Sequence, residues 1–301
     1  MSQQVLDPVT GAAAGPARRR PRRLALAWAT AHDAGFRGVL IGLGLFLAIA
    51  VLGPFAYRAD PSTVHLSNAL KAPSGAHPFG TDEFGRDVLA RFLGGARISF
   101  LLGVTSVLGA AVVGTFVGAF AGFYGGWPDS VISRFLDGLL AFPALIMGMT
   151  LALAMGPGAL PAGLAVAITG IPWYARVVRS EVLSLKSREF VDAQRALGAS
   201  RMHILLRHVL PSVLGGVSVQ ASLGVAYAVL AIAGLGFLGL GVQPPSPEWG
   251  SMITEGRTYL TSGQWWISVI PGVGILVLVS LSVALGERMR DYFDPYGKIH
   301  Y

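Results

Sequence analysis

Long stretches without Asp, Glu, Lys or Arg constrain this 301-residue chain more than any other feature. The five longest contain 20, 31, 38, 40 and 29 residues and lie at 38–57, 98–128, 138–175, 208–247 and 258–286. A helix of about 20 apolar residues crosses a hydrocarbon layer of about 30 Å. Runs of this length therefore predict a protein that spans a membrane several times.

The composition supports this prediction and excludes several functions. Only 13% of the residues are charged, which is about half the fraction found in soluble domains. No cysteine is present, which excludes disulfides, thiolate metal sites and cysteine nucleophiles. None of the three lysines lies in the G-x-x-x-x-G-K-[ST] pattern of a phosphate-binding loop, so we expect no nucleotide site in this chain.

The charge-free runs predict six membrane-spanning helices. The run 138–175 is divided by Gly156-Pro157-Gly158 into two helices joined by a tight turn, and each other run contributes one. The first span, 38–57, begins too far into the chain for a typical cleaved signal peptide, so we expect it to remain as an anchor. The fifth helix should start at Pro211, and the sixth should cover 265–286. The chain is thus expected to be an all-α polytopic membrane protein.

The distribution of positive charge predicts the orientation. If the amino terminus is inside, the cytoplasmic segments hold 17 of the 23 Lys and Arg residues and the outer segments hold six. Cytoplasmic loops are enriched in Lys and Arg, so both termini are predicted to be cytoplasmic. The basic cluster at 18–23 then sets topology and contacts anionic lipid, and we expect no nucleic-acid site there. The predicted segments are a cytoplasmic tail 1–37, a first span 38–57, an outer loop 58–97, a core 98–286 that includes a cytoplasmic loop 181–211, and a cytoplasmic tail 287–301.

The outer loop 58–97 concentrates charged residues. We expect an interfacial helix within it, on which Asp82 pairs with Arg86 and Asp87 pairs with Arg91 at i,i+4 spacing. The alternative is a metal site, which matches no standard ligand spacing. Its ligands would be His77, Asp82, Glu83 and Asp87.

Two further patterns concern packing within the membrane. Gly114, Gly118 and Gly122 form a ladder of small residues, as do Gly38 and Gly42, and such ladders let helix backbones approach closely. Three tryptophans are expected to be anchors at the membrane interface. They are Trp249, Trp265 and Trp266.

The cytoplasmic loop 181–211 carries the clearest local pattern. Phe190, Ala193 and Leu197 follow i, i+3, i+7 spacing and form one apolar face of a short helix. Gly198 is suited to end this helix in the left-handed conformation. Such a helix either lies at the lipid interface or docks into a cleft on a soluble partner.

A second short helix is predicted directly after the first. Ser200 can cap it at its start, and it should cover 201–210. Pro211 is expected to stop it.

This loop resembles the EAA loop (E-A-A-x3-G-x9-I-x-L-P) of permeases of binding-protein-dependent ABC importers. Asp192-Ala193-Gln194, Gly198 and Leu210-Pro211 match its spacing. Asp192, Gln194 and His208 stand where the motif has Glu, Ala and Ile. Two more segments resemble dipeptide/oligopeptide permease C subunits. The first precedes the second span and runs from His77-Pro78-Phe79-Gly80-Thr81-Asp82-Glu83-Phe84-Gly85-Arg86-Asp87 through Ser99, and the second runs from Gly234 to Gly250 and contains Pro247-Glu248-Trp249. The closing Arg290-Asp291-Tyr292-Phe293-Asp294-Pro295 also fits, so the resemblance covers about 35–296.

The resemblance implies a type I (MetI-like) importer permease in a prokaryotic cytoplasmic membrane. Its implied partners are a sister permease of the DppB/OppB kind, two ABC ATPases that bind ATP and Mg, and an extracytoplasmic solute-binding protein. The chain itself would hold no cofactor, metal or catalytic residue. The implied cargo is a di- or oligopeptide, with nickel or another solute as the alternative, along a path lined by Ala, Gly, Ser and Thr.

The resemblance also implies two sets of site residues. Glu248 and Trp249 would lie near the docked binding protein. The helix 189–199 would be the coupling helix in a groove of one ATPase. Its coupling residues would be Glu189, Phe190, Asp192, Ala193, Gln194, Leu197, Gly198 and Ala199.

Three other classes compete with this reading. A transporter driven by an ion gradient usually carries ionisable groups near the membrane midplane, and the charge-free runs contain none there. A membrane enzyme would need a buried catalytic pair, which the sequence does not indicate. A scaffold without transport would leave uptake unchanged when the chain is deleted.

Overall fold

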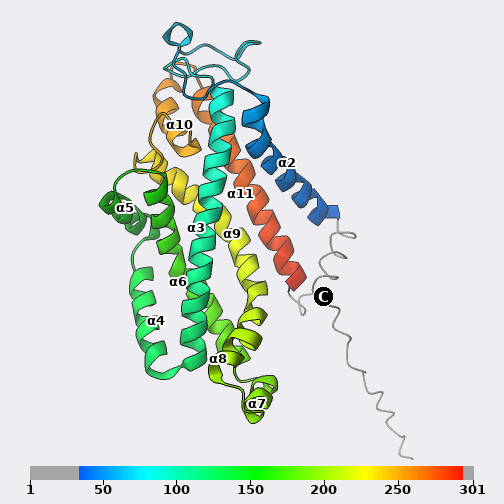
Figure 1. Cartoon of the computed structure of the whole chain (residues 1–301). Coiled ribbons are helices and arrows are strands. Elements are labelled where there is room, and N and C mark those ends of the chain that lie inside the picture. Colours follow the sequence, from blue (N-terminus) through cyan, green and yellow to red (C-terminus); the bar gives the residue numbers. More distant parts are fainter. Residues whose placement is uncertain (1–33, 294–301) are drawn as a thin grey trace, which may run out of the picture.

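The computed structural model describes residues 34–293, so the predictions for 1–33 and 294–301 lie outside the described residues. Within the described range the chain forms a bundle of helices along one main axis (Figure 1). The long helices are α2 (Ala34–Ala56), α3 (Val88–Tyr124), α6 (Ala159–Leu185), α9 (Leu210–Phe237) and α11 (Trp266–Phe293). The shorter ones are α4 (Gly126–Leu140), α5 (Ala144–Met155), α7 (Glu189–Ala196), α8 (Arg201–Ile204) and α10 (Trp249–Gly256). The predicted all-α class is confirmed for this part of the chain.

In residues 34–293 four helical runs, or five with one bent pair, meet the expectation for a membrane-crossing helix, which is roughly consistent with the six predicted spans. Four helical runs are long and apolar enough to cross a membrane: α2, α3, the continuous run Arg201–Phe237 and most of α11. Helices α4 and α5 together form a fifth candidate that is bent by 91° at its centre. Helix α6 is less apolar because its last turns carry Arg176, Arg179 and Glu181.

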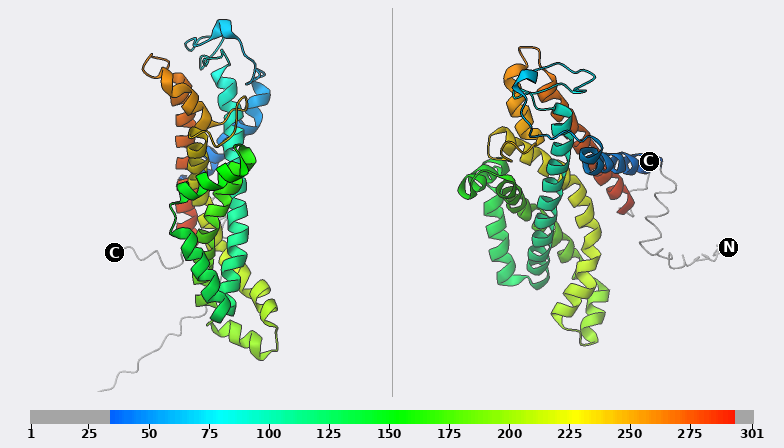
Figure 2. Two further views of the ribbon diagram at one scale, coloured as in Figure 1. Left: turned by 90° about the vertical axis from the view of Figure 1, so that its left-hand side faces the viewer. Right: turned by 45° about the horizontal axis from the view of Figure 1, so that its top comes forward.

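The two ends of the bundle carry different segments. The loop 57–87 lies at one end, and α7 projects from the opposite end (Figures 1 and 2). The first turn of α2 and the last turn of α11 are the ends of these two helices that lie nearer to α7 (Figure 1). This arrangement agrees with the predicted orientation, in which both termini share a side with the loop 181–211.

Close packing of α3 on α6 confirms the main glycine ladder. A Cβ atom added at Gly118 would lie 2.2 Å from the carbonyl oxygen of Ala175, and one at Gly122 would lie 2.9 Å from that of Arg179. Only glycine permits this approach, because every other residue places an atom where the partner backbone stands. The second ladder contributes at one position only: Gly42 packs against Leu281, whereas Gly38 faces open space.

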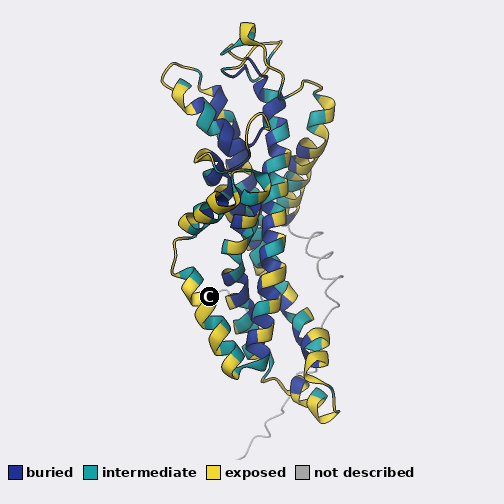
Figure 3. Ribbon diagram, turned by 60° about the vertical axis from the view of Figure 1, so that its left-hand side comes forward, coloured by how far each residue is buried: buried dark blue, intermediate teal, exposed yellow. Residues whose placement is uncertain are grey.

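The outer surface of the bundle is apolar. Large side chains such as Ile41, Leu45 and Leu276 are exposed, and Figure 3 shows exposed residues along the outward faces of the helices. An apolar surface of this extent fits contact with lipid rather than with water.

Helices α3 and α4 both begin earlier than the charge-free runs predict. Helix α3 starts at Val88 instead of 98 because Asp87 caps it, accepting a hydrogen bond of 2.9 Å from the amide of Ala90. Helix α4 starts at Gly126 and includes Asp129 and Asp137, which pair with α6.

Pro143 separates α4 from α5. It stands immediately before Ala144, the first residue of α5. A proline lacks the backbone N–H that would continue the hydrogen-bond ladder of α4.

Pro211 does not stop the helix at 201–210, so that prediction was wrong. A π-helical turn, Leu205–Val209, joins α8 to α9, and the amide of Leu210 donates to the carbonyl of Leu205, five residues earlier. In an ordinary α-helix each amide bonds to the carbonyl four residues earlier, a pattern that the proline ring disrupts. The five-residue spacing of the π-helical turn avoids this conflict, so the helix continues through Pro211.

Candidate functional site

Helix α7 begins and ends with the signals expected from the sequence. Glu189 and Asp192 lie in its first turn, and Arg195 lies in its last turn. Negative charge at the start of a helix and positive charge at its end both interact favourably with the helix dipole. Gly198 has a φ of +78°, and its amide donates to the carbonyl of Arg195 at 2.9 Å. The amide of Ala199 donates to the carbonyl of Gln194 at 3.0 Å. These two bonds complete a Schellman ending, which confirms the predicted role of Gly198 in the turn.

The apolar face of α7 points away from the bundle. Phe190 is 38% exposed and Leu197 is 80% exposed, and Ala193 between them is also exposed. Exposing a large apolar stripe to water is unfavourable by about 25 cal/mol for each Å². The stripe therefore has the character of a binding surface whose partner lies outside this chain.

The opposite side of α7 is anchored in the core, which sequence reasoning missed. Val191 is completely buried, and so is Ile204 in α8. Both belong to the core cluster that contains Val182 of α6 and Val209 before α9. Val191 and Ile204 thus connect α7 to the end of α6 and to the start of α9. The only sequence signal for the anchor is that Val191 is apolar and lies off the stripe.

The start of α8 confirms the predicted helix cap at Ser200. The side chain of Ser200 accepts a hydrogen bond of 3.3 Å from the amide of His203 at the start of α8. Asp192 and Arg195 form an ion pair of 2.9 Å on the surface of α7. Both side chains are exposed, so this pair adds little stability.

Two ion pairs fasten α4 to α6. Arg179 binds both carboxylate oxygens of Asp129, one of them at 2.8 Å from Nη2. Arg176 pairs with Asp137 one turn earlier on α6. The partners are more than 35 residues apart in the sequence.

At the other end of the bundle, a buried charge cluster ties the outer loop to α10. Asp82 accepts from Arg86 Nε at 2.6 Å and from Arg91 Nη1 at 3.0 Å. Glu255 of α10 accepts from Arg86 Nη2 at 2.9 Å and from Arg91 Nη2 at 2.7 Å. Each guanidinium thus bridges two carboxylates, and these four charges balance.

The prediction of an interfacial helix within 58–97 was wrong for most of this segment. Residues 77–87 are not helical, and only a short 3-10 turn, Leu66–Asn68, precedes α3. The predicted Asp82–Arg86 pair is present, but Arg91 pairs with Asp82 and Glu255 instead of Asp87.

Asp87 holds the end of α2 against the start of α3. Besides capping α3, it accepts a hydrogen bond of 2.9 Å from the hydroxyl of Tyr57 and lies 2.8 Å from Nδ1 of His77. Burial, together with Asp87, raises the pKa of Tyr57 to about 12.

Three carboxylates of the buried charge cluster lie close enough together to hold a cation. Ligand oxygens of Asp82, Glu83 and Glu255 lie within 4.8 Å of one another. Arg86 and Arg91 already supply positive charge to this group. Burial raises the pKa of Glu83 above its ordinary value.

Glu248 and Trp249 are completely buried, so neither side chain offers surface to a docked protein. Glu248 caps α10 by accepting from the amides of Gly250 and Ser251, both at 2.9 Å. Burial raises its pKa, and these hydrogen bonds oppose the rise. Trp249 stacks on Phe92 of α3 with ring centroids 5.3 Å apart.

The interfacial-anchor prediction fails for two of the three tryptophans. Trp249 belongs to the core, and Trp266 is buried as well, donating its indole N–H to the carbonyl of Thr81 at 3.1 Å. Only Trp265 is exposed. The buried pair seats α10 and the start of α11 against the outer loop and α3.

Comparison with known proteins extends these observations. The family described as "binding-protein-dependent transport system inner membrane component" matches residues 114–296, which include all of the loop 181–211. The dipeptide transport system permease protein DppC of Alkalihalophilus pseudofirmus is 41% identical over 256 residues, covering 85% of this chain and 84% of that protein. The probable D,D-dipeptide transport system permease protein DdpC of Escherichia coli is 41% identical over 251 residues, covering 83% and 84%.

The fold also resembles a solved structure. In the inward-facing MetNI methionine ABC transporter, one chain matches with a TM-score of 0.55 and 20% identity. The match covers 69% of this chain and 97% of that chain, and at this identity it shows the fold alone. The predicted MetI-like fold is thereby confirmed. This chain belongs to the family of binding-protein-dependent transport system inner membrane components and is a multi-pass permease of the ABC importer type.

Proposed function

We propose that this chain is one of the two membrane subunits of an ATP-driven importer of short peptides in a prokaryotic cytoplasmic membrane. A sister permease would complete the path, and two ABC ATPases would bind ATP and Mg at the end that carries α7. A solute-binding protein would deliver the peptide at the end that carries the loop 57–87. This chain would hold no cofactor and catalyse no reaction.

The exposed apolar stripe on an anchored helix carries this proposal. Phe190 and Leu197 face outward, while Val191 fixes the same helix to the core. A helix held in this way moves as a unit with the ends of α6 and α9. Closure of the ATPases on ATP would displace α7 and, through Val191 and Ile204, shift these two helices between inward- and outward-open arrangements.

Peptide cargo is supported by the relatives. The two permeases at 41% identity are named for dipeptide and D,D-dipeptide transport, and each is matched over 84% of its length. Nickel or another small solute is the alternative cargo.

Uptake by proteoliposomes distinguishes the two cargoes. The vesicles would contain this chain with its sister permease and ATPases, and the binding protein and tritiated dialanine would be added outside. We expect dialanine to accumulate when ATP is enclosed, with unlabelled dipeptides competing and excess nickel chloride having no effect. Accumulation of radioactive nickel without dialanine uptake would contradict the peptide proposal.

A further inference from the structure

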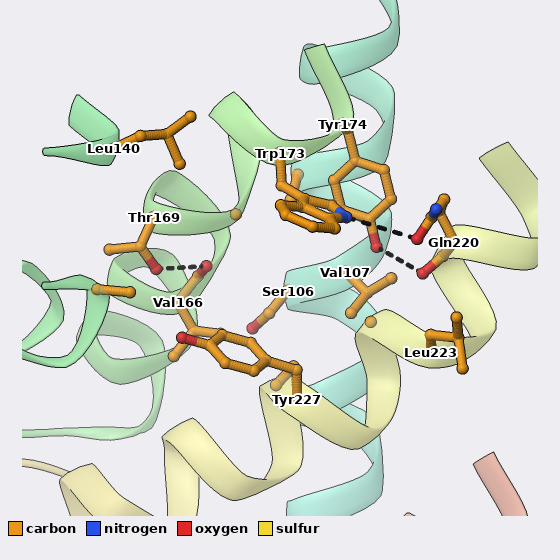
Figure 4. A pocket seen from close by; sticks show the side chains of 15 residues that line it. Ser106, Val107, Leu140, Val166, Thr169, Trp173, Tyr174, Gln220, Leu223 and Tyr227 are labelled. Atoms are coloured by element: carbon orange, nitrogen blue, oxygen red, sulfur yellow. Dashed lines mark hydrogen bonds between the residues drawn. The ribbon is translucent and has the colours of Figure 1, made fainter. Parts of the chain in front are cut away.

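A cavity of about 450 Å³ lies at mid-height in the bundle, between α3, α6, α9 and the bend between α4 and α5 (Figure 4). It meets α3 at Ser106 and α9 at Gly224, close to the middle of each helix. Leu140 and Ala144, on either side of the bend, line it as well. Since the two helices cross the membrane, their midpoints place the cavity near the centre of the bilayer.

Uncharged polar side chains face this cavity without adequate partners. In the described part of the chain, the hydroxyl of Tyr227 and the side-chain N–H₂ of Gln220 make no hydrogen bond, and the indole N–H of Trp173 reaches the Gln220 oxygen only at 3.5 Å. Figure 4 shows the three side chains around one space, with Trp173 next to Gln220. Polar groups at this depth are costly against lipid, so they indicate a cavity that holds water or a polar solute.

The cavity lining is uncharged and mostly apolar, with polar side chains at a few points only. None of the side chains that line it is Asp, Glu, Lys, Arg or His. Asp137 and Arg176 lie three residues from the lining residues Leu140 and Trp173, and they pair with each other. A neutral lining favours a ligand recognised through amide groups over an ion or a strongly charged headgroup.

The open side of the cavity is formed by exposed side chains. Trp173 is 56% exposed and Tyr227 is 57% exposed in this chain. This side of the cavity is therefore open in the single chain. In the proposed function, the sister permease covers it.

We propose that this cavity is the chain's share of the translocation path, in which Gln220 and Tyr227 hydrogen-bond to the backbone amides of a peptide in transit and Trp173 narrows the cytoplasmic side. This inference rests on the proposed function. The volume lies within the range of about 300–1,000 Å³ typical of small-molecule sites. Gln and Tyr each both donate and accept, as a peptide bond does. Weak, uncharged contacts suit passage, because a transported solute must leave as readily as it enters.

This lining differs from the expected path of Ala, Gly, Ser and Thr. Small residues are present, among them Ser106, Ala110 and Thr169. The hydroxyls of Ser106 and Thr169 already bond to backbone carbonyls, at 2.9 and 3.0 Å. The free hydrogen-bonding capacity therefore resides in the larger side chains, which composition alone did not indicate.

Site-specific photocrosslinking tests the inference. The photoreactive residue p-benzoylphenylalanine would replace Tyr227 or, as control, Phe120, an exposed residue on α3 that lines a different, apolar groove. The complete transporter in vesicles would be irradiated during ATP-driven turnover with tritiated dialanine and its binding protein. We expect a labelled adduct from position 227 and none from position 120.

Uptake measured in the same vesicles separates the two proposals. Vesicles that import dialanine but give no labelled adduct at 227, or adducts with lipid or the neighbouring permease alone, would overturn the inference and leave the proposed function standing. Vesicles that contain all partners and the unsubstituted chain but import no dialanine would contradict the proposed function, and the inference with it.

Substitution provides a second readout. Gln220→Leu should lower dialanine uptake about tenfold, the equivalent of one lost hydrogen bond, while ATP hydrolysis stimulated by the binding protein stays normal. Gln243→Leu, in the segment between α9 and α10 and outside the cavity lining, is the matched control and should change neither rate. A proportional fall of both rates in Gln220→Leu would indicate a structural role and overturn the inference.

Discussion

Replacing Phe190 by aspartate should abolish peptide uptake while leaving the protein folded in the membrane. Phe190 is already part-exposed and faces away from the core, so the substitution costs the isolated chain little. In the complex, however, it would place a charge without a partner in an apolar contact with the ATPase. The measurement is dialanine uptake together with ATP hydrolysis stimulated by the binding protein, and both should fall to background.

The adjacent residue supplies a control for this prediction. Val191 is completely buried, so Val191→Asp should instead reduce the amount of folded protein recovered from the membrane. Gly198→Pro should act like Phe190→Asp, because proline cannot adopt a φ of +78° and lacks the amide that bonds to Arg195. Normal transport by Phe190→Asp would show that the stripe is not the point where force enters.

The largest loss of stability is expected from Arg91→Met. Arg91 is buried between Asp82 and Glu255, so its removal leaves the carboxylates of the cluster, Glu83 included, with the single guanidinium of Arg86. Breaking a buried ion pair in this way costs about 3–5 kcal/mol in the free energy of unfolding. Denaturant unfolding of the detergent-solubilised protein, followed by tryptophan fluorescence, would measure it.

Arg97→Met is the matched control for this loss, because Arg97 lies on the same helix but is exposed and should change stability by less than about 0.5 kcal/mol. Equal stability of the two variants at neutral pH would contradict the assigned role of the charge cluster.

Local hydrophobicity predicted the strongly apolar helices, and the prediction failed where charges are neutralised by partners far away in the sequence. Asp129 and Asp137 bound two of the charge-free runs, yet α4 includes both of them, paired with Arg179 and Arg176 of α6. Arg91 likewise lies inside α3 because its partner Glu255 comes from a segment 164 residues later. Neither pairing leaves a trace in the neighbouring sequence.

The candidate site shows the same division. The start of α7, its exposed stripe and its ending at Gly198 are set by residues within a few positions of one another, and these were predictable. The burial of Glu248 and Trp249 was not predictable, because it depends on Ser99 and Phe92 of α3, about 150 residues away in the sequence. The cavity is lined by residues of α3, α6 and α9 together, an arrangement that no single segment of the sequence specifies.

The source of energy tests the central claim most directly. Dialanine uptake would be measured in proteoliposomes that contain all the partners, with ionophores present to dissipate proton and sodium gradients. We predict that uptake requires enclosed ATP and continues when the gradients are collapsed. Uptake that needs no ATP and stops when a proton or sodium gradient is dissipated would contradict the account and identify a gradient-driven transporter.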